Sequence, residues 1–387
     1  MKKNIKKIFF IIIFFFCFVI DNFDKYAIYV KCIKDKAEIY KIKSFLKFCS
    51  NSNIVIKKFK KRDKPKISII TAIYNREKFL SRFLKNLQYQ NFKDIEIIFV
   101  DDFSKDNSVY IIKEFQKRDK RIVLIRNRKN RGTFIARNIG VLHSKGKYIN
   151  IPDPDDILSK DILKISYRIG KRFNYDIIRF NILMTKGNLG NSEILNDIQT
   201  GPIYQPDLSN YIFYGSKELQ ITDMVIYNKF LKREAFIKAL NLLEAIYLKL
   251  YMVYFEDGLI NYFVHLAGKS FYFYKKRVGY HHKRTAESIT KNHFKYKYAM
   301  TKNLFIYLKF VFQTSKNTQY SKDKANHLLS FIINNLDVPN ILSRTNFSKD
   351  VNLYNNITNT FLDSLFINNE NKNFLQKIKE IIRRKNY

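Results

Sequence analysis

The chain of 387 residues contains no tryptophan and only three cysteines, Cys17, Cys32 and Cys49. No pair of them has CxxC spacing, so the cysteines do not suggest a zinc site. Cys17 lies in an apolar run, whereas Cys32 and Cys49 could form a disulfide in an oxidising compartment or remain free thiols. Internal repeats and a long linker are also missing. The length and the hydrophobic content of 46% allow about two domains with a sizeable core.

Acidic residues are scarce, with 34 Asp and Glu against 71 Lys and Arg, which gives a formal net charge of +37. Such an excess suggests an anionic partner, which could be nucleic acid, a membrane surface or a phosphorylated ligand. The lysines are spread along the chain rather than gathered into one stripe, so a bias in base composition explains the charge equally simply. Charge alone is therefore a weak argument for nucleic-acid binding.

The N-terminus contains a basic stretch with four lysines, followed by thirteen apolar residues from Ile8 to Ile20. As a helix this run covers about 20 Å, which is less than the roughly 30 Å of a hydrocarbon layer and typical of a signal-peptide core. Because no small-x-small cleavage site follows, we favour an uncleaved signal anchor over a cleaved signal, and a buried apolar helix is the weaker alternative. The flanking lysines would stay cytosolic. The glycosylation sequons at Asn346 and Asn356 fit a luminal C-terminal region, although an Asn-rich chain also contains sequons by chance.

Strand-like and helix-like segments alternate from Lys66 onward. The runs KISIITAI, IEIIFVDD, RIVLIRN and KYINIP are typical of short buried strands, and EKFLSRFLKNLQYQ, SVYIIKEFQKRD and FIARNIGVLHSKG have helical spacing. This alternation predicts a mostly parallel sheet with helices on both faces. Ligands of such sheets bind at the carboxyl ends of the strands. Residues 183–220 are rich in Gly and Pro and are predicted to form loops or a hairpin.

Two groups of carboxylates directly follow predicted strands. Asp101 and Asp102 end one apolar run, and Asp153, Asp155 and Asp156 follow another. Like charges at this spacing repel one another, and ionised groups near a core are costly. A positive species should therefore bind there, and a divalent cation is the first candidate. Any single Asp after a strand is more often a turn residue or a helix cap, so the prediction depends on the whole pattern.

Five segments occur in an order that resembles the family 2 glycosyltransferases of the GT-A fold. They are KISIITAIYNREKFL, IEIIFVDDFSKDNS, NRGTFIARNIG, GKYINIPDPDDIL and FEDGLINYFVHLAGKSFYFYKKRVGYHHKRTAESIT, and together they cover about Lys66 to Thr290. The resemblance is specific for the fold and not for the sugar. It implies an α/β, Rossmann-like, mostly parallel sheet with helices on both faces. The expected domains are an anchor or signal at 1–20, a stem at 21–64, the GT-A domain at 65–290 and a helical C-terminal extension at 291–387.

The resemblance assigns a donor site for a nucleotide-diphospho-sugar, with a UDP-sugar favoured. Asp102 would bind the ring N–H of uracil or another base, because an ionised carboxylate only accepts hydrogen bonds. Arg137 would meet the base or the diphosphate, and helix–sheet packing through Gly140 can hold alongside that role. The implied donor-binding residues are Ala72, Tyr74, Asn75, Asp102, Arg137 and Asp153, with Asp101 as a secondary candidate.

The resemblance also implies a Mn²⁺ or Mg²⁺ site. Asp153 and Asp155 would form the DxD motif, with one carboxylate near the ribose and the other on the metal, which neutralises the diphosphate leaving group. His282 could complete the metal site, and His281 and Arg284 are secondary candidates near the phosphates. A histidine in a surface loop is an equally good interpretation of this segment.

Asp257 is implied to be the general base that takes the proton of the acceptor hydroxyl, with Glu256 beside it, and the product would have inverted configuration. The alternative for this pair is an acidic first helical turn favoured by the helix dipole. Asp156 is either an acceptor behind the metal site or the cap of a following helix, and we favour the cap. Phe103 replaces the glycine that is common after the acidic pair, which could alter that turn.

Without tryptophan the chain lacks the QxxRW signature of processive polysaccharide synthases, so we expect transfer of one or a few hexosyl or N-acetylhexosaminyl units to a glycan, lipid or protein. The predicted location is the endoplasmic reticulum or Golgi membrane, with a single span and a luminal catalytic domain, or outside the cell if the signal is cleaved. The main alternative is a non-catalytic GT-A scaffold that binds nucleotide or glycan. A sugar nucleotidyltransferase would need a Gly-rich loop where TAIYNREKF stands, and nucleic-acid binding explains neither the acidic groups nor the N-terminus.

Overall fold

The computed structural model describes residues 65–185, 192–194, 202–204, 225–242, 252, 256–282 and 376. All of these belong to one compact unit, Phe48–Tyr387. The predicted anchor, the stem, the three cysteines, both sequons, Arg284 and all of the C-terminal extension except residue 376 lie outside the described residues. Among the described helices, none is long and apolar enough to span a bilayer. The domain boundaries therefore stay predictions.

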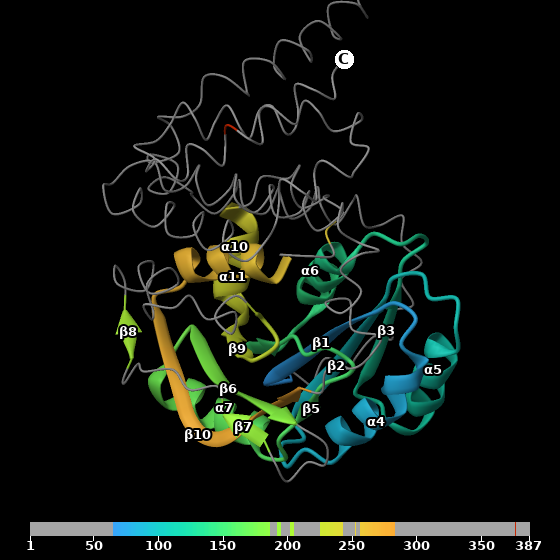
Figure 1. Cartoon of the computed structure of the whole chain (residues 1–387), viewed down its shortest axis with the longest axis horizontal. Helices are drawn as coiled ribbons and strands as arrows, with labels where there is room; N and C mark the ends of the chain where they lie inside the picture. The colour runs from blue at the N-terminus through green and yellow to red at the C-terminus, as the bar shows by residue number, and fades with distance from the viewer. Residues whose placement is uncertain are drawn as a thin grey trace, which may run out of the picture. The chain divides into compact units, whose positions relative to one another are not determined.

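The core of the fold is one twisted sheet of ten strands (Figure 1). Eight of them form a continuous path in the order β3-β2-β1-β4-β9-β6-β10-β5, while β7 pairs with β6 and β8 pairs with β10. The strands are β1 (Ile67–Ile73), β2 (Ile95–Asp101), β3 (Ile122–Arg126), β4 (Tyr148–Asn150), β5 (Ile157–Leu158), β6 (Ile177–Thr185), β7 (Ser192–Ile194), β8 (Ile203–Tyr204), β9 (Lys229–Lys232) and β10 (Ser270–His282).

The first four strands are the four predicted from the sequence, and they are parallel. β1 pairs in parallel with β2 and β4, and β2 with β3. Strand β9 is antiparallel to both β4 and β6, and β10 is parallel to β6. The expected mostly parallel α/β sheet is therefore confirmed. In the described part of residues 183–220, β6 continues to Thr185 and two short strands, β7 and β8, follow.

Six described helices cover the sheet, and Figure 1 shows α6, α10 and α11 on one side and α4 and α5 on the other. Along β1 and β2 alternate residues face opposite sides, so Ile69 and Phe99 join the core under α4 whereas Ile70 and Val100 lie under α6. Both strands carry apolar residues on both faces because both faces are buried, and Ser68 and Glu96 are buried as a hydrogen-bonded pair. The helices are α4 (Glu77–Gln88), α5 (Ser108–Arg118), α6 (Thr133–His143), α7 (Ile162–Phe173), α10 (Arg233–Leu242) and α11 (Glu256–Ala267).

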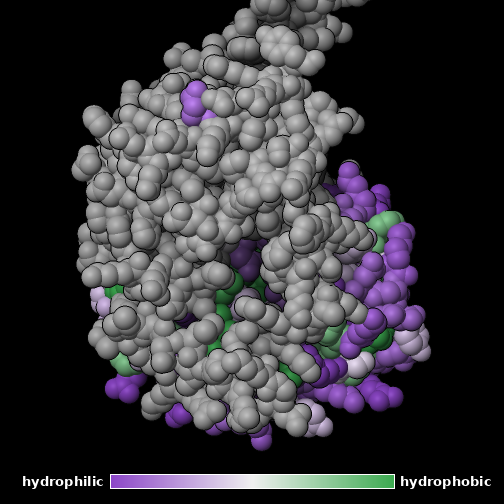
Figure 2. Space-filling model, viewed as in Figure 1, coloured by the Kyte–Doolittle hydropathy of each residue, from purple (hydrophilic) through white to green (hydrophobic). Residues whose placement is uncertain are grey.

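The outer faces of α4 and α5 are strongly polar. Figure 2 shows a mainly hydrophilic surface on the side of these helices. Leu80, Phe83 and Leu84 of α4 point inward at the helical spacing seen in the sequence. The residues of these helices that face the sheet are thus mainly apolar and buried, and those that face the solvent are mainly charged or polar.

Helix α6 lies close to the sheet at Gly140. A β-carbon added there would be 2.3 Å from Cγ2 of Ile70 and 3.2 Å from Cγ2 of Val100. Glycine therefore allows the close approach of the helix that carries Arg137. The expected packing role of this segment is confirmed by these contacts.

We expect Gly140→Ala to lower the free energy of unfolding by about 1–2 kcal/mol, because overpacking outweighs the gain in helix propensity. Chemical denaturation would measure the change. In an Ile70→Ala background, which removes the crowding methyl group, the same substitution should cost much less. An equal cost in both backgrounds would contradict the packing explanation.

Candidate functional site

Asp101 ends β2 and is fully buried. Its Oδ1 accepts the backbone N–H of Ser104 at 3.1 Å, and its Oδ2 accepts Nε of Arg126, on the neighbouring strand β3, at 3.0 Å. Asp101 thus stabilises the turn between β2 and α5. Each oxygen of its carboxylate therefore has a donor from the protein itself.

Asp102 holds the loop that leads into α6. Its carboxylate accepts Nδ2 of Asn127 at 2.8 Å and the backbone N–H groups of Arg131 and Gly132 at 2.9 and 2.7 Å. The side chain is buried, and burial raises its pKa although these hydrogen bonds oppose the rise. The predicted contact with a nucleotide base stays a prediction. The structure adds a positioning role that the sequence did not indicate.

The loop after β1 is joined to the turn after β2. Asn75 has a left-handed backbone with φ of 51°, its N–H donates to Oγ of Ser104 at 3.0 Å, and its Oδ1 accepts the N–H of Lys105 at 2.8 Å. Phe103 has φ of 73°, so the turn keeps the left-handed conformation that favours glycine even though a bulky residue stands there. Tyr74 is 45% exposed beside this loop, and Ala72 is half-buried at the end of β1. Their predicted contacts with a nucleotide stay predictions.

A pocket of about 390 Å³ lies next to this loop, at the start of α4. It is separate from the acidic residues after β4. It is lined by Asn75, Arg76, Glu77, Lys78, Phe79, Lys105 and Asp106. Only Asn75 among these was expected at the donor site.

The turn after β4 is held by its own aspartates. The N–H of Asp156 donates to the carbonyl of Asp153 at 3.1 Å, and the N–H of Asp153 donates to Oδ2 of Asp156 at 3.3 Å. Arg82 of α4 donates to the carbonyl of Asp155 at 2.8 Å. The predicted helix-cap role of Asp156 is wrong, because the strand β5 follows it and α7 begins only at Ile162. Asp156 is fully buried and fixes the DxD turn instead.

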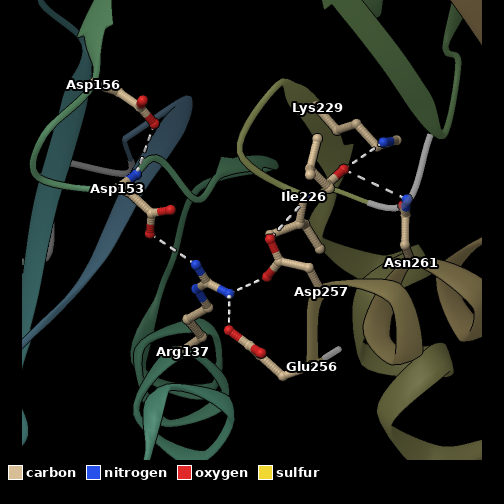
Figure 3. Close-up of polar contacts among 9 residues, drawn as sticks. Arg137, Asp153, Asp156, Ile226, Lys229, Glu256, Asp257 and Asn261 are labelled. Atoms are coloured by element: carbon tan, nitrogen blue, oxygen red, sulfur yellow. Dashed lines mark hydrogen bonds and ion pairs between the residues drawn. The ribbon is translucent and has the colours of Figure 1, made fainter. Parts of the chain in front are cut away.

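Arg137 joins three carboxylates from distant parts of the chain (Figure 3). Its Nη2 donates to Oδ1 of Asp153 at 2.8 Å, and its Nη1 donates to Oε1 of Glu256 at 3.2 Å and to Oδ1 of Asp257 in a short contact. The Arg137 side chain is only 3% exposed. The guanidinium on α6 therefore connects the DxD turn with the first turn of α11. We call Arg137, Asp153, Glu256 and Asp257 the acidic cluster.

The acidic cluster carries more negative than positive charge. Three carboxylates face one guanidinium, so full ionisation would leave a formal charge of −2. Burial and the neighbouring Asp257 raise the pKa of Glu256 to about 7, and burial raises the pKa of Asp257 as well. The three carboxylates in turn raise the pKa of Arg137 against the effect of burial. The acidic cluster is thus suited to receive a further cation.

The side chains that remain accessible identify the open side of the acidic cluster. Asp153 is 36% exposed and Asp257 is 20% exposed, whereas Glu256 is 10% exposed. Hard divalent cations prefer carboxylate oxygens, so Asp153 has the right chemistry and accessibility for such a ligand. Among the described side chains, no group of three or more His, Cys, Asp or Glu could hold a metal by itself. Substrate phosphates and water would have to supply the remaining ligands.

Two of the predicted histidines belong to a strand rather than a loop. The backbone of His281 pairs with Ile157 and Leu183, and that of His282 pairs with Met184, at the end of β10. Their side chains are outside the described part of the structure, as is Arg284. Their predicted contacts with metal or phosphate stay predictions.

Comparisons with known proteins show what the chain is similar to. Residues 68–240 match the model of glycosyl transferase family 2. An uncharacterized glycosyltransferase of Haemophilus influenzae is 36% identical over 124 residues, which are 32% of this chain and 47% of that protein. Glycosyltransferase GlyG of Streptococcus pneumoniae is 35% identical over 120 residues, which are 28% of this chain and 40% of that protein. The match thus spans less than half the length of these relatives.

The fold is also similar to that of S. aureus TarS. The crystal structure of TarS 1-349 in complex with UDP-GlcNAc has a TM-score of 0.60 and 16% identity, and it covers 83% of this chain and 89% of that one. At this identity the likeness concerns the fold. Residues 68–240 therefore match glycosyl transferase family 2, and the described fold is GT-A-like.

Proposed function

We propose that the chain is a metal-dependent, inverting glycosyltransferase that moves a sugar from a nucleotide-diphosphate donor to a hydroxyl group of a glycan, lipid or protein. The observation that carries this proposal is the acidic cluster. It brings the DxD turn after β4 and the first turn of α11 to a single guanidinium, at the edge of the sheet where ligands of parallel sheets bind.

Asp257 is the best candidate for the general base. One of its oxygens is paired with Arg137 and the other accepts the N–H of Ile226 at 3.4 Å, so the carboxylate is fixed while remaining 20% exposed. A base held in this way can accept the proton of an acceptor hydroxyl as that hydroxyl attacks the anomeric carbon from the side opposite the diphosphate. Such an in-line attack inverts the configuration of the sugar.

Asp153 and Asp155 would hold Mn²⁺ or Mg²⁺, which when bound supplies positive charge to the departing diphosphate. Arg137 contributes a second positive charge, and because it contacts both Asp153 and Asp257 it sets their mutual orientation. Asp102 and Asn75 support the two loops that would line the nucleotide. The residues in these roles follow the ends of β1, β2 and β4 or lie on α6.

The donor is proposed to be a UDP-sugar of the hexosyl or N-acetylhexosaminyl type. The TarS structure with UDP-GlcNAc supports this choice through similarity of fold. A single-pass membrane location in the endoplasmic reticulum or Golgi remains a proposal from the N-terminal apolar run, which lies outside the described residues. The alternative, a non-catalytic scaffold, would not require the fixed geometry of Asp257.

Calorimetry of the full chain with UDP, GDP, CDP and ADP, each with and without Mn²⁺, tests the donor site. We expect one nucleotide to bind in a Mn²⁺-dependent manner, and Asp155→Asn to weaken that binding by about 100-fold because a charged metal ligand is lost. Asp161→Asn is the matched control, since Asp161 contacts Asn91 on the surface and should leave binding unchanged. Folded protein that binds no nucleotide would refute the proposed function.

A further inference from the structure

Lys229 is a buried cation behind the acidic cluster. It is the first residue of β9 and only 1% exposed. Its Nζ donates to the carbonyl of Val225 at 2.5 Å and to Oδ1 of Asn228 at 3.3 Å. Burying an ammonium group costs several kcal/mol even after relaxation, so the acceptors of Lys229 have to compensate for its lost hydration. One of these acceptors belongs to the loop that leads into β9.

The Val225 carbonyl is also bound from α11. Asn261, fully buried, donates Nδ2 to this oxygen at 3.5 Å, and the backbone N–H of Lys229 donates to the carbonyl of Ile226 at 3.1 Å. Helix α11 and strand β9 therefore hold the start of the short loop of residues 225–228, while Asn150 of β4 donates to the Tyr227 carbonyl and Phe180 of β6 pairs with Asn228. The loop is fixed both at its start and at its entry into β9.

That loop in turn contacts the proposed base. The N–H of Ile226, the residue after Val225, donates to Oδ2 of Asp257 at 3.4 Å, while Oδ1 of Asp257 faces Arg137. Figure 3 shows the continuous path from Lys229 through the loop to Asp257 and Arg137. Asp257 is thus oriented from one side by Arg137 and from the other by a backbone donor that Lys229 keeps in place.

We infer, on the basis of the base role proposed for Asp257, that Lys229 is a positioning residue for catalysis. It holds the Val225 carbonyl so that the Ile226 N–H orients the Asp257 carboxylate, and its charge favours the ionised form of that carboxylate. The side chain does not touch substrate; it acts through the loop and through its electric field.

The charges around Asp257 support this role. Burial raises the pKa of Asp257, Arg137 lowers it, Asp153 raises it, and Lys229 lowers it together with the Ile226 N–H. Glu256 precedes Asp257 on the same helix, and the Tyr227 phenol also interacts with Asp257, with its own pKa raised by burial. Arg137 and Lys229 are therefore both cations that oppose desolvation of the base. Loss of Lys229 should make Asp257 harder to ionise.

The test compares the full-length Lys229→Met variant with Lys232→Met. Lys232 lies on the same strand but pairs with Asp176 at 3.1 Å, so it controls for loss of a lysine from β9. Turnover is followed as UDP release from UDP-GlcNAc with Mn²⁺, and exchange of the Ile226 amide is followed by mass spectrometry. We expect Lys229→Met to lower kcat by about 30-fold with KM changed less than about threefold, and to shift the acidic limb of the kcat profile upward by about one pH unit.

Exchange of the Ile226 amide should accelerate at least about tenfold in Lys229→Met and not in Lys232→Met. Lys229→Arg, which keeps a charged donor, should restore most of the protection and the position of the acidic limb. If Lys229→Met does not fold, Asn261→Leu, which removes the other donor to Val225, should give a smaller change in the same direction.

Two outcomes overturn the inference. In Lys229→Met the Ile226 amide could exchange at the same rate as in the wild type, or kcat and its pH profile could equal those of the wild type. Failure of the proposed function looks different, because Asp257→Asn would then retain turnover, or no nucleotide would bind. In that case the exchange data alone still decide whether Lys229 holds the loop against Asp257.

Discussion

Asp257→Asn should lower turnover by about a thousandfold or more while leaving nucleotide affinity within a few-fold. The amide has nearly the shape of the carboxylate but cannot accept the proton of an attacking hydroxyl, and loss of a general base typically costs 10²- to 10⁴-fold in rate, on the order of 3–5 kcal/mol. The rest of the donor site would be unchanged, since Asp257 is not among the residues proposed to hold the nucleotide. Single-turnover assays with the donor identified by calorimetry would measure the chemical step.

Glu256→Gln is the matched control for this prediction. Glu256 precedes Asp257 and contacts the same Nη1 of Arg137, but its side chain is less exposed and its pKa is raised to about 7. The neutral amide mimics its protonated form, so turnover should fall less than tenfold. Equal losses in the two variants would mean that the pair acts only by holding Arg137. Full turnover in Asp257→Asn would exclude Asp257 as the base.

Arg137→Met should lower the free energy of unfolding by about 3–5 kcal/mol at pH 8, because it leaves buried carboxylates without their cation. Arg137 is 3% exposed and contacts Asp153, Glu256 and Asp257 at once. Lys238→Met, which removes an exposed pair with Glu234, should change stability by less than about 1 kcal/mol. Urea denaturation at constant salt would measure both variants.

The loss in Arg137→Met should grow with pH. In the wild type the pKa of Glu256 is raised from 4.5 to about 7 by burial and Asp257, so the folded state holds a proton that the unfolded state has released between those values. That contribution to stability is present below about pH 4.5 and is lost as the pH rises through 7. Without the guanidinium the carboxylates hold protons to still higher pH, so the variant should lose stability more steeply. Adding Glu256→Gln should recover part of the loss, and a pH-independent deficit would contradict an electrostatic cause.

The sequence predicts the parallel half of the sheet well, because β1, β2 and β3 are mainly apolar runs separated by amphipathic helices. It also predicts Asp153 directly after a strand and Asp257 at the start of a helix, as the structure has them. It could not show that both meet Arg137, since the contact with Asp257 joins residues 120 positions apart in the chain. Such a contact depends on the order of the strands, which local patterns do not encode.

The sequence also does not show where a side chain binds the backbone of its own turn. Asp156 was expected to cap a helix, but the two-residue strand β5 intervenes and its carboxylate accepts the N–H of Asp153. At Asp102 the contact with a nucleotide base stays a prediction, and the structure adds three donors from residues 127–132 that the sequence does not indicate. A lysine in the otherwise apolar stretch KFL at the start of β9 was the one available signal for Lys229, and spacing alone could not distinguish it from a solvated residue.

Asp102 sets where α6 begins, and Arg137 lies about one and a half turns further along that helix. Any change at Asp102 that shifts Gly132 would be carried along this rigid segment to the guanidinium, and from there to Asp153 and Asp257. Under the proposed function, the nucleotide contact at Asp102 and the general base Asp257 therefore depend on the same helix. A substitution at Asp102 that is meant to alter donor specificity would therefore have to rebuild the loop of residues 127–132 at the same time.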